Sequence, residues 1–304
     1  MDPITLILTI SGLALFEIIS SIDNAIVNAE VLHTMSEKSK KWFLFWGLLF
    51  AVFIIRGLLP WVIVYASNPA LGVIGSFTAA WSGDPAIKQA LDASSPILLL
   101  GGGTFLILLF LHWLFIEDKR FGLPHERFFA ELSPWFYAVA SLFLLCVVWL
   151  GIHVNVYAAF GAVVGSTAFF ITHGFKETAE KAEEELASGE SRRSDISKIL
   201  YLEAIDSTFS IDGVLGAFAF TLSVPLIIIG NGIGACIVRQ LTVGNIERIK
   251  RLVYLKNGAM YSILFLGMIM ALDAFGVAVP GWVSPAITFL IVGFFFQKSR
   301  SGTE

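Results

Sequence analysis

The stretch FEIISSIDNAIVNAEV, residues Phe16–Val31, places Glu17, Asp23 and Asn24 inside an apolar segment long enough to cross a bilayer. A charged side chain at the centre of a membrane helix costs roughly 2.5–3.5 kcal/mol on insertion scales, so such residues are rare and usually functional. We therefore expect these side chains to face a protein interior, a partner charge or a bound cation.

The same pattern returns in the second half of the chain, within YLEAIDSTFSIDGVLGAF at Tyr201–Phe218. The tripeptide Ser-Ile-Asp ends at Asp23 and again at Asp212, 189 residues later, and the same offset relates Glu17 to Asp206. Both halves thus carry two acids at one spacing inside a hydrophobic segment. This repetition predicts two related acidic membrane helices.

The composition of the chain supports a polytopic membrane protein. Of its 304 residues, 56% are hydrophobic and only 14% are charged, whereas a soluble domain has about 25% charged residues. The N-terminal sequence lacks a positive region, so we expect a retained first helix and not a cleaved signal peptide. Cys146 and Cys236 lie in apolar segments, which predicts small buried side chains and no disulfide or thiolate metal site.

A spanning helix needs about 20 apolar residues, and this length predicts an all-α fold of nine membrane helices. The short apolar stretch Leu71–Ala80 is expected to be an interfacial or re-entrant piece between the second and third spans. The seventh span is short and rich in glycine, so we expect it to be broken. The spans are Ile4–Asn28, Trp42–Tyr65, Pro96–Ile116, Pro134–Leu150, Val154–Thr172, Ile199–Leu222, Val224–Val238, Leu252–Phe275 and Val279–Phe296.

The distribution of basic residues predicts the orientation. With the N-terminus outside, 17 of the 20 Lys and Arg fall on the cytoplasmic side, in agreement with the positive-inside rule. The two acidic helices then run in opposite directions, and residues 98–118 weakly resemble residues 254–273. We therefore predict two inverted three-helix repeats, an architecture typical of alternating-access transporters.

These repeats divide the chain into five parts. Residues 1–116 and 199–275 form the repeats, and residues 117–173 form two linking helices. Residues 174–198 form a charged cytoplasmic loop, interpreted as a solvated connector or as a docking site for a cytoplasmic partner. Residues 276–304 form the C-terminal helix and tail. A homo-oligomer is compatible with this organisation.

Helical geometry limits how the acids can converge. Glu17, Ser21 and Asn24 share one helix face, whereas Asp23 lies about 120° away from Glu17. We therefore expect both acidic helices to kink or open, so that carboxylates and freed carbonyls meet at the midplane. The predicted metal ligands are Glu17, Asp23, Asn24, Glu203, Asp206 and Asp212. Residues assigned to the pathway or to counter-charge are Ser21, Ser210, Arg56 and Asn231.

Oxygen ligands of this kind suit hard divalent cations, with Mn²⁺ first and Ca²⁺ second. No Cys or His accompanies either motif, which argues against Cu⁺ or a thiolate zinc site. The acids outnumber the needs of one divalent ion, which leaves room for proton exchange. The alternative is that the carboxylates are neutral and only join helices through polar contacts.

The SIDNA sequence at Ser21–Ala25, with Glu17 before it, resembles the first motif of the TerC family of integral membrane proteins. AIDSTFSIDG in the second half, ending at Gly213, is similar to that family's second acidic motif. The resemblance covers both repeats, and the predicted extra helices indicate a divergent branch. TerC proteins are grouped with LysE-type transporters and associated with tellurite resistance and manganese export, so the resemblance implies metal transport.

These observations favour a secondary transporter that exports a divalent cation, manganese first, across a bacterial cytoplasmic membrane. The sequence contains no GxxxxGK[ST], HExxH or GxSxG motif, which argues against ATP as the direct energy source and against an enzyme. The alternative is a membrane scaffold for metal handling or tellurite and stress resistance that transports nothing itself.

Overall fold

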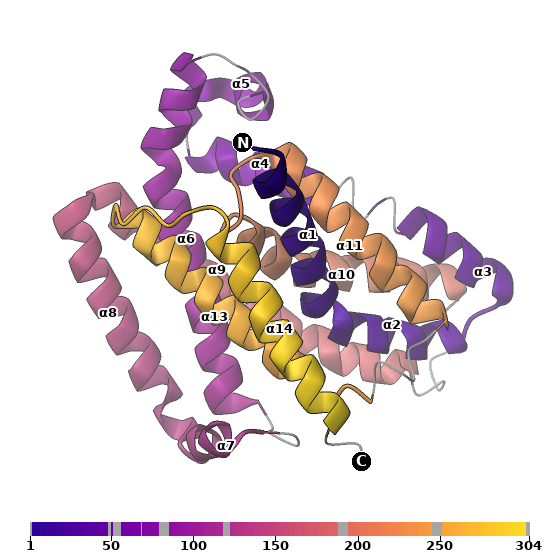
Figure 1. Cartoon of the computed structure of the whole chain (residues 1–304). Coiled ribbons are helices and arrows are strands. Elements are labelled where there is room, and N and C mark those ends of the chain that lie inside the picture. Colours follow the sequence, from indigo (N-terminus) through magenta and orange to yellow (C-terminus); the bar gives the residue numbers. More distant parts are fainter. Residues whose placement is uncertain are drawn as a thin grey trace.

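A computed structural model describes residues 2–47, 50, 56–67, 69–78, 85–117, 122–187, 194–244 and 251–301 (Figure 1). Regular structure in these residues is entirely helical, with no strand. The helices of the first half are α1 (Pro3–Ser20), α2 (Ile22–His33), α3 (Glu37–Trp42), α4 (Arg56–Ser67), α5 (Gly72–Thr78), α6 (Pro85–Ile116) and α7 (Pro124–Glu131). Those of the second half are α8 (Phe136–Val154), α9 (Val156–Ala187), α10 (Asp195–Ala217), α11 (Val224–Gly244), α13 (Leu255–Ala274) and α14 (Val283–Ser301). A π-helical turn covers Phe43–Gly47, and 3₁₀ turns cover Pro69–Leu71 and Ser133–Trp135.

Six segments of the described chain are long and apolar enough to cross a membrane, which confirms an all-α membrane protein. The expected second span falls partly on residues outside the described ranges, and α10 and α14 carry more polar residues. The count of nine spans therefore stays a prediction. The six segments are Pro3–Ser20, Ser95–Ile116, Ser133–His153, Val156–Phe175, Val224–Thr242 and Leu255–Ala274.

Two expectations were wrong, the broken seventh span and the buried cysteines, and one helix extends beyond its predicted span. The glycine-rich seventh span is a continuous helix, α11, because its glycines allow close packing against α1. The helix of the fifth span continues through the start of the charged loop to Ala187. Cys146 and Cys236 are exposed on the outer faces of α8 and α11 and are not buried.

Helix α6 is the central element of the fold, with α9 on one side and α13 on another. A Cβ at Gly101 would lie 2.9 Å from the carbonyl oxygen of Gly161, so the backbones of α6 and α9 nearly touch. On the α13 side, Gly103 lies against Gly267 in the same way. Small residues permit this approach, and close backbone packing is a main source of attraction between helices in lipid.

Helices α6 and α13 run antiparallel. Near the middle of the bundle Gly102 contacts Met270, whereas at the far end of α6 the ammonium of Lys256 pairs with Glu117 at 2.6 Å. Residue numbers therefore rise along α6 as they fall along α13. These are the two segments whose sequences weakly resemble each other.

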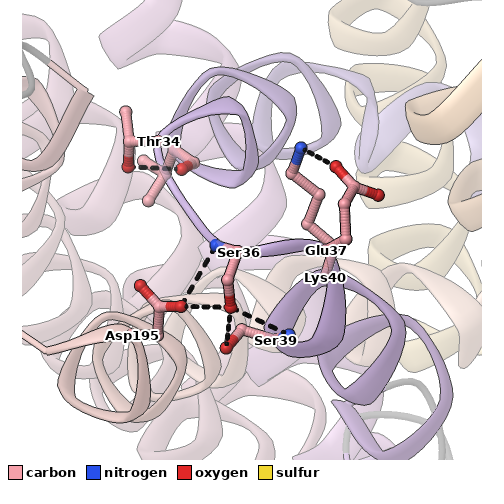
Figure 2. A network of polar contacts seen from close by, with 7 residues as sticks. Thr34, Ser36, Glu37, Ser39, Lys40 and Asp195 are labelled. Atoms are coloured by element: carbon pink, nitrogen blue, oxygen red, sulfur yellow. Dashed lines mark hydrogen bonds and ion pairs between the residues drawn. The ribbon is translucent and has the colours of Figure 1, made fainter.

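A polar clasp joins the turn between α2 and α3 to the start of α10, as Figure 2 shows. The carboxylate of Asp195 accepts hydrogen bonds from the Ser36 hydroxyl at 2.7 Å and the Ser36 amide at 3.1 Å. The hydroxyls of Ser36 and Ser39 lie 2.9 Å apart, and buried Lys198 donates to Thr34 Oγ1 at 2.8 Å. Segments 159 residues apart are thereby fixed to each other.

The close packing of α6 and α9 leads to a matched pair of glycine variants. A Cβ at Gly165 would overlap the carbonyl group of Gly101, whereas a Cβ at Gly174, on the same helix, meets nothing within 4 Å. We expect Gly165→Ala to destabilise the fold by roughly 1–3 kcal/mol through overpacking. Gly174→Ala should be neutral or stabilising by roughly 0.5–1 kcal/mol, because alanine favours the helix. Thermal melts of both variants in detergent test this, and equal melting temperatures would contradict the packing described.

The clasp predicts a dependence of stability on pH. The Ser36 hydroxyl, followed by Ser39 and the Ser36 amide, lowers the pKa of the Asp195 carboxyl below its ordinary value. The stabilisation is therefore complete above the unfolded pKa of about 4 and is lost as pH falls through the lower folded pKa. A double-mutant cycle of Asp195→Ala and Ser36→Ala should show coupling at pH 7 that declines as the pH falls below about 4. Strict additivity at pH 7 would show that the two residues do not interact.

Candidate functional site

The first acidic segment bends at Ser21. Helix α1 ends at Ser20, α2 begins at Ile22, and Ser21 between them has φ −95° and ψ 0°. The Ser21 amide still donates to the Glu17 carbonyl at 3.1 Å, and the Ser20 hydroxyl donates to the same carbonyl at 3.3 Å. Figure 1 shows α2 leaving α1 in a new direction. The expected kink is thus present in the first acidic helix.

The second acidic segment has no such bend, contrary to expectation. Helix α10 is continuous from Asp195 to Ala217 and passes through Asp206, Ser210 and Asp212 without interruption. Its hydrogen-bonded backbone supplies no freed carbonyls there. Any ligands from α10 are therefore side chains, and the two acidic segments differ in local geometry.

Glu17 lies at the junction of α1, α10 and α11 and has no exposed surface. Its Oε1 accepts a hydrogen bond from the Ser21 hydroxyl at 2.6 Å. Its Oε2 lies 3.2 Å from the position that a Cβ at Gly213 would take, and Gly234 of α11 lies against its aliphatic carbons. Two glycines on neighbouring helices therefore make the space for this carboxylate.

Helices α1 and α10 are antiparallel where they meet. Phe16 packs on Gly216 and Glu17 faces Gly213, so residue numbers rise on one helix as they fall on the other. Asp212 is the neighbour of Gly213 in α10 and is half-buried. The contact thus joins the two acidic motifs at the predicted site.

Asn231 of α11 is completely buried one turn before Gly234. Within the described part of the chain, neither its amide oxygen nor its amide nitrogen has a hydrogen-bond partner. An unsatisfied buried polar group costs about 1–3 kcal/mol, so such a group calls for an explanation such as a water or an ion. Asn231 lies near Glu17, and its assignment to the pathway stays a prediction.

Glu203 has a basic partner, Arg239, which lies one residue beyond the predicted seventh span. Arg239 belongs to α11, and its guanidinium lies 3.5 Å from Glu203 Oε1, with both side chains about nine-tenths buried. The guanidinium also stacks 4.2 Å from the centre of the Phe43 ring and donates to the Phe43 carbonyl at 3.4 Å. The seventh predicted span ends at Val238, whereas α11 continues through Arg239 to Gly244.

The described acids occupy two places and not one. Glu203 precedes Gly213 by ten residues, which is about 15 Å along the axis of α10 from the position that faces Glu17. Within the described ranges, no three His, Cys, Asp or Glu side chains gather closely enough to hold a metal ion. Asn24 is half-buried on α2. The side chains of four predicted site residues lie outside the described part of the structure: Asp23, Asp206, Ser210 and Arg56.

The helices described above define the chain as an all-α membrane protein. Residues 22–301 match the model of a family described as "Protein of unknown function (DUF475)", and the protein belongs to this family. The matched range includes the second acidic motif and begins directly after the bend at Ser21. A comparison with curated proteins and with solved structures found no match.

The pair of Glu203 and Arg239 can be tested by single and double substitution. Removing one partner leaves a buried charge uncompensated, so Glu203→Leu or Arg239→Leu should each destabilise the protein by about 3–5 kcal/mol. The double variant should be substantially more stable than either single variant, because no charge is then left buried. The measurement is unfolding in detergent followed by circular dichroism. A double variant as unstable as the sum of the single effects would argue against the pairing.

Proposed function

We propose that the protein is a secondary transporter of a hard divalent metal cation, with manganese first and calcium second, and that it exports this ion across a bacterial cytoplasmic membrane. The observation that carries the proposal is the fully buried Glu17 carboxylate at a bend in an apolar helix, facing the second acidic helix beside Asp212. A carboxylate in this position is costly unless a charge or proton compensates it.

The packing of the helices supports the inverted-repeat part of the proposal. In the proposed repeats, α1 corresponds to α10, α4 to α11 and α6 to α13. A contact between α1 and α11 should then have a counterpart between α10 and α4. Both contacts are present in the structure. The corresponding pairs α1–α10 and α6–α13 are in contact and antiparallel. Together with the apolar lengths and the distribution of basic residues, this packing leads us to propose nine spans with the N-terminus outside and the C-terminus in the cytoplasm.

The chemistry of the site residues supports the choice of ion. Glu17, Ser21, Asp212 and Asn231 offer carboxylate, hydroxyl and amide oxygens, which are hard ligands. Asp23 and Asp206 complete the proposed set from the same two motifs, and the resemblance of these motifs to the TerC family favours manganese. Arg239 compensates Glu203. A carboxylate that loses its metal can take up a proton, which makes proton coupling part of the proposal.

Flux measurements on vesicles test the proposal. We expect vesicles containing the purified protein to accumulate Mn²⁺, detected by quenching of an enclosed metal-sensitive dye. Glu17→Gln and Asp212→Asn keep size and hydrogen bonding but remove a charge, so each should reduce the flux by about tenfold or more. Cu⁺ should not be carried, because the site contains only oxygen ligands.

The matched control is Glu37→Gln, which removes a charge from an exposed residue on α3. Its flux should equal that of the unchanged protein, and melts should show that all variants are folded. No flux from the folded unchanged protein would favour the scaffold alternative. Normal flux from both Glu17→Gln and Asp212→Asn would show that these acids are structural.

A further inference from the structure

A groove opens between α7, α13 and α14, three helices that carry none of the acidic-motif residues. It has a volume of about 350 Å³, and its walls are almost entirely apolar. On α14, Leu290 and Phe294 are 73% and 59% exposed. Because α13 is a candidate membrane span, we expect these outward faces to contact hydrocarbon and not water. The residues used below are His125, Tyr261, Phe265, Leu290, Ile291 and Phe294.

One end of this groove is polar. His125 Nε2 lies 2.5 Å from the Tyr261 hydroxyl, and both residues line the groove. Beneath them Glu126 is fully buried, and its Oε2 accepts hydrogen bonds from the Leu123 amide at 2.7 Å and the Asn257 side chain at 2.8 Å. These bonds fix the short helix α7 to α13, so the polar wall is held in place.

Basic side chains follow the groove residues at the C-terminal end of α14. The Tyr254 amide donates to Ser299 Oγ at 3.0 Å, which places the last turn of α14 beside the start of α13. Lys298 follows Phe294 by one helical turn, and its ammonium lies 5.2 Å from the centre of the Tyr254 ring. Arg300 is in the same last turn.

Two acidic groups of the described chain near this end already have partners of their own. The Glu117 carboxylate pairs with Lys256 at 2.6 Å, and Glu126 is buried and hydrogen-bonded. Arg127 is exposed on α7, next to His125 and Glu126. A ligand that fits is therefore an amphiphile with an apolar chain and a negative head.

We propose that this groove binds one phospholipid with an anionic head group. The acyl chain lies along Phe265, Leu290 and Phe294, and the phosphate meets Lys298 and His125 at the polar end. Basic pockets between membrane helices bind anionic head groups by the same physics. The bilayer itself supplies this occupant, and the inference stands whether or not the protein transports metal.

Native mass spectrometry tests the proposal on the full chain. The protein is equilibrated with equimolar phosphatidylglycerol and phosphatidylcholine in nanodiscs, released into mild detergent and weighed intact. We expect one retained lipid per chain, with phosphatidylglycerol in excess. Lys298→Gln should lower that excess by about fivefold, because it removes one attractive charge at the head group. Ile291→Trp fills the groove from α14 and should abolish retention of either lipid.

Two matched controls complete the experiment. Lys41→Gln removes an exposed positive charge on α3, and Leu142→Trp enlarges an exposed apolar side chain on α8. Neither should change lipid retention. The proposal is overturned if Lys298→Gln behaves like Lys41→Gln, or if Ile291→Trp retains as much lipid as Leu142→Trp. It is also overturned if inorganic phosphate binds in place of the lipid and the retained mass carries no acyl chain.

Discussion

The burial of one carboxylate constrains the arrangement of three helices in this protein. Glu17 has no exposed surface, yet it lies in a segment apolar enough to span a membrane. Burying an ionised group is expensive, so its neighbours must supply hydrogen bonds, a proton or a counter-ion. The bend at Ser21 brings a hydroxyl onto one oxygen, and the glycines at 213 and 234 allow two other helices to close over the group.

The second buried acid is compensated in a different way. Glu203 has a guanidinium beside it, and the same guanidinium stacks on an aromatic ring. Arginine suits this place because its planar group can pair, donate and stack together. Two acids of similar sequence context therefore have different surroundings: one sits among small residues and hydroxyls, the other against a fixed positive charge. Under the proposed function, Glu17 exchanges a bound metal ion or proton, whereas Glu203 keeps Arg239 as its constant partner.

The fold class and the presence of acids inside apolar segments were predictable from the sequence because both depend on local features. Apolar length predicts spans, and a buried carboxylate is conspicuous in an apolar segment. The pairing of Arg239 with Glu203 was not predictable. Glu203 lies on another helix, and the sequence around Arg239 becomes more polar toward the end of α11. The continuous α11 was missed because glycine weakens an isolated helix, while in lipid it also permits close packing. The uninterrupted α10 was missed for a related reason: repeated sequence does not require repeated backbone geometry when the packing neighbours differ.

The two helices that enclose Glu17, α10 and α11, are synthesised much later than Glu17 itself. Gly213 and Gly234 follow it by about 200 residues, which at 5–20 residues per second corresponds to roughly 10–40 s of synthesis. Throughout that interval the first helix has left the ribosome without the two helices that enclose its acid. The nascent helix must then carry Glu17 as the neutral acid or keep it near water at the insertion machinery. The carboxylate that the folded protein encloses therefore makes insertion of the first helix more costly. The hydroxyl of Ser21, four residues away, is one of the few partners available to Glu17 from the start of synthesis.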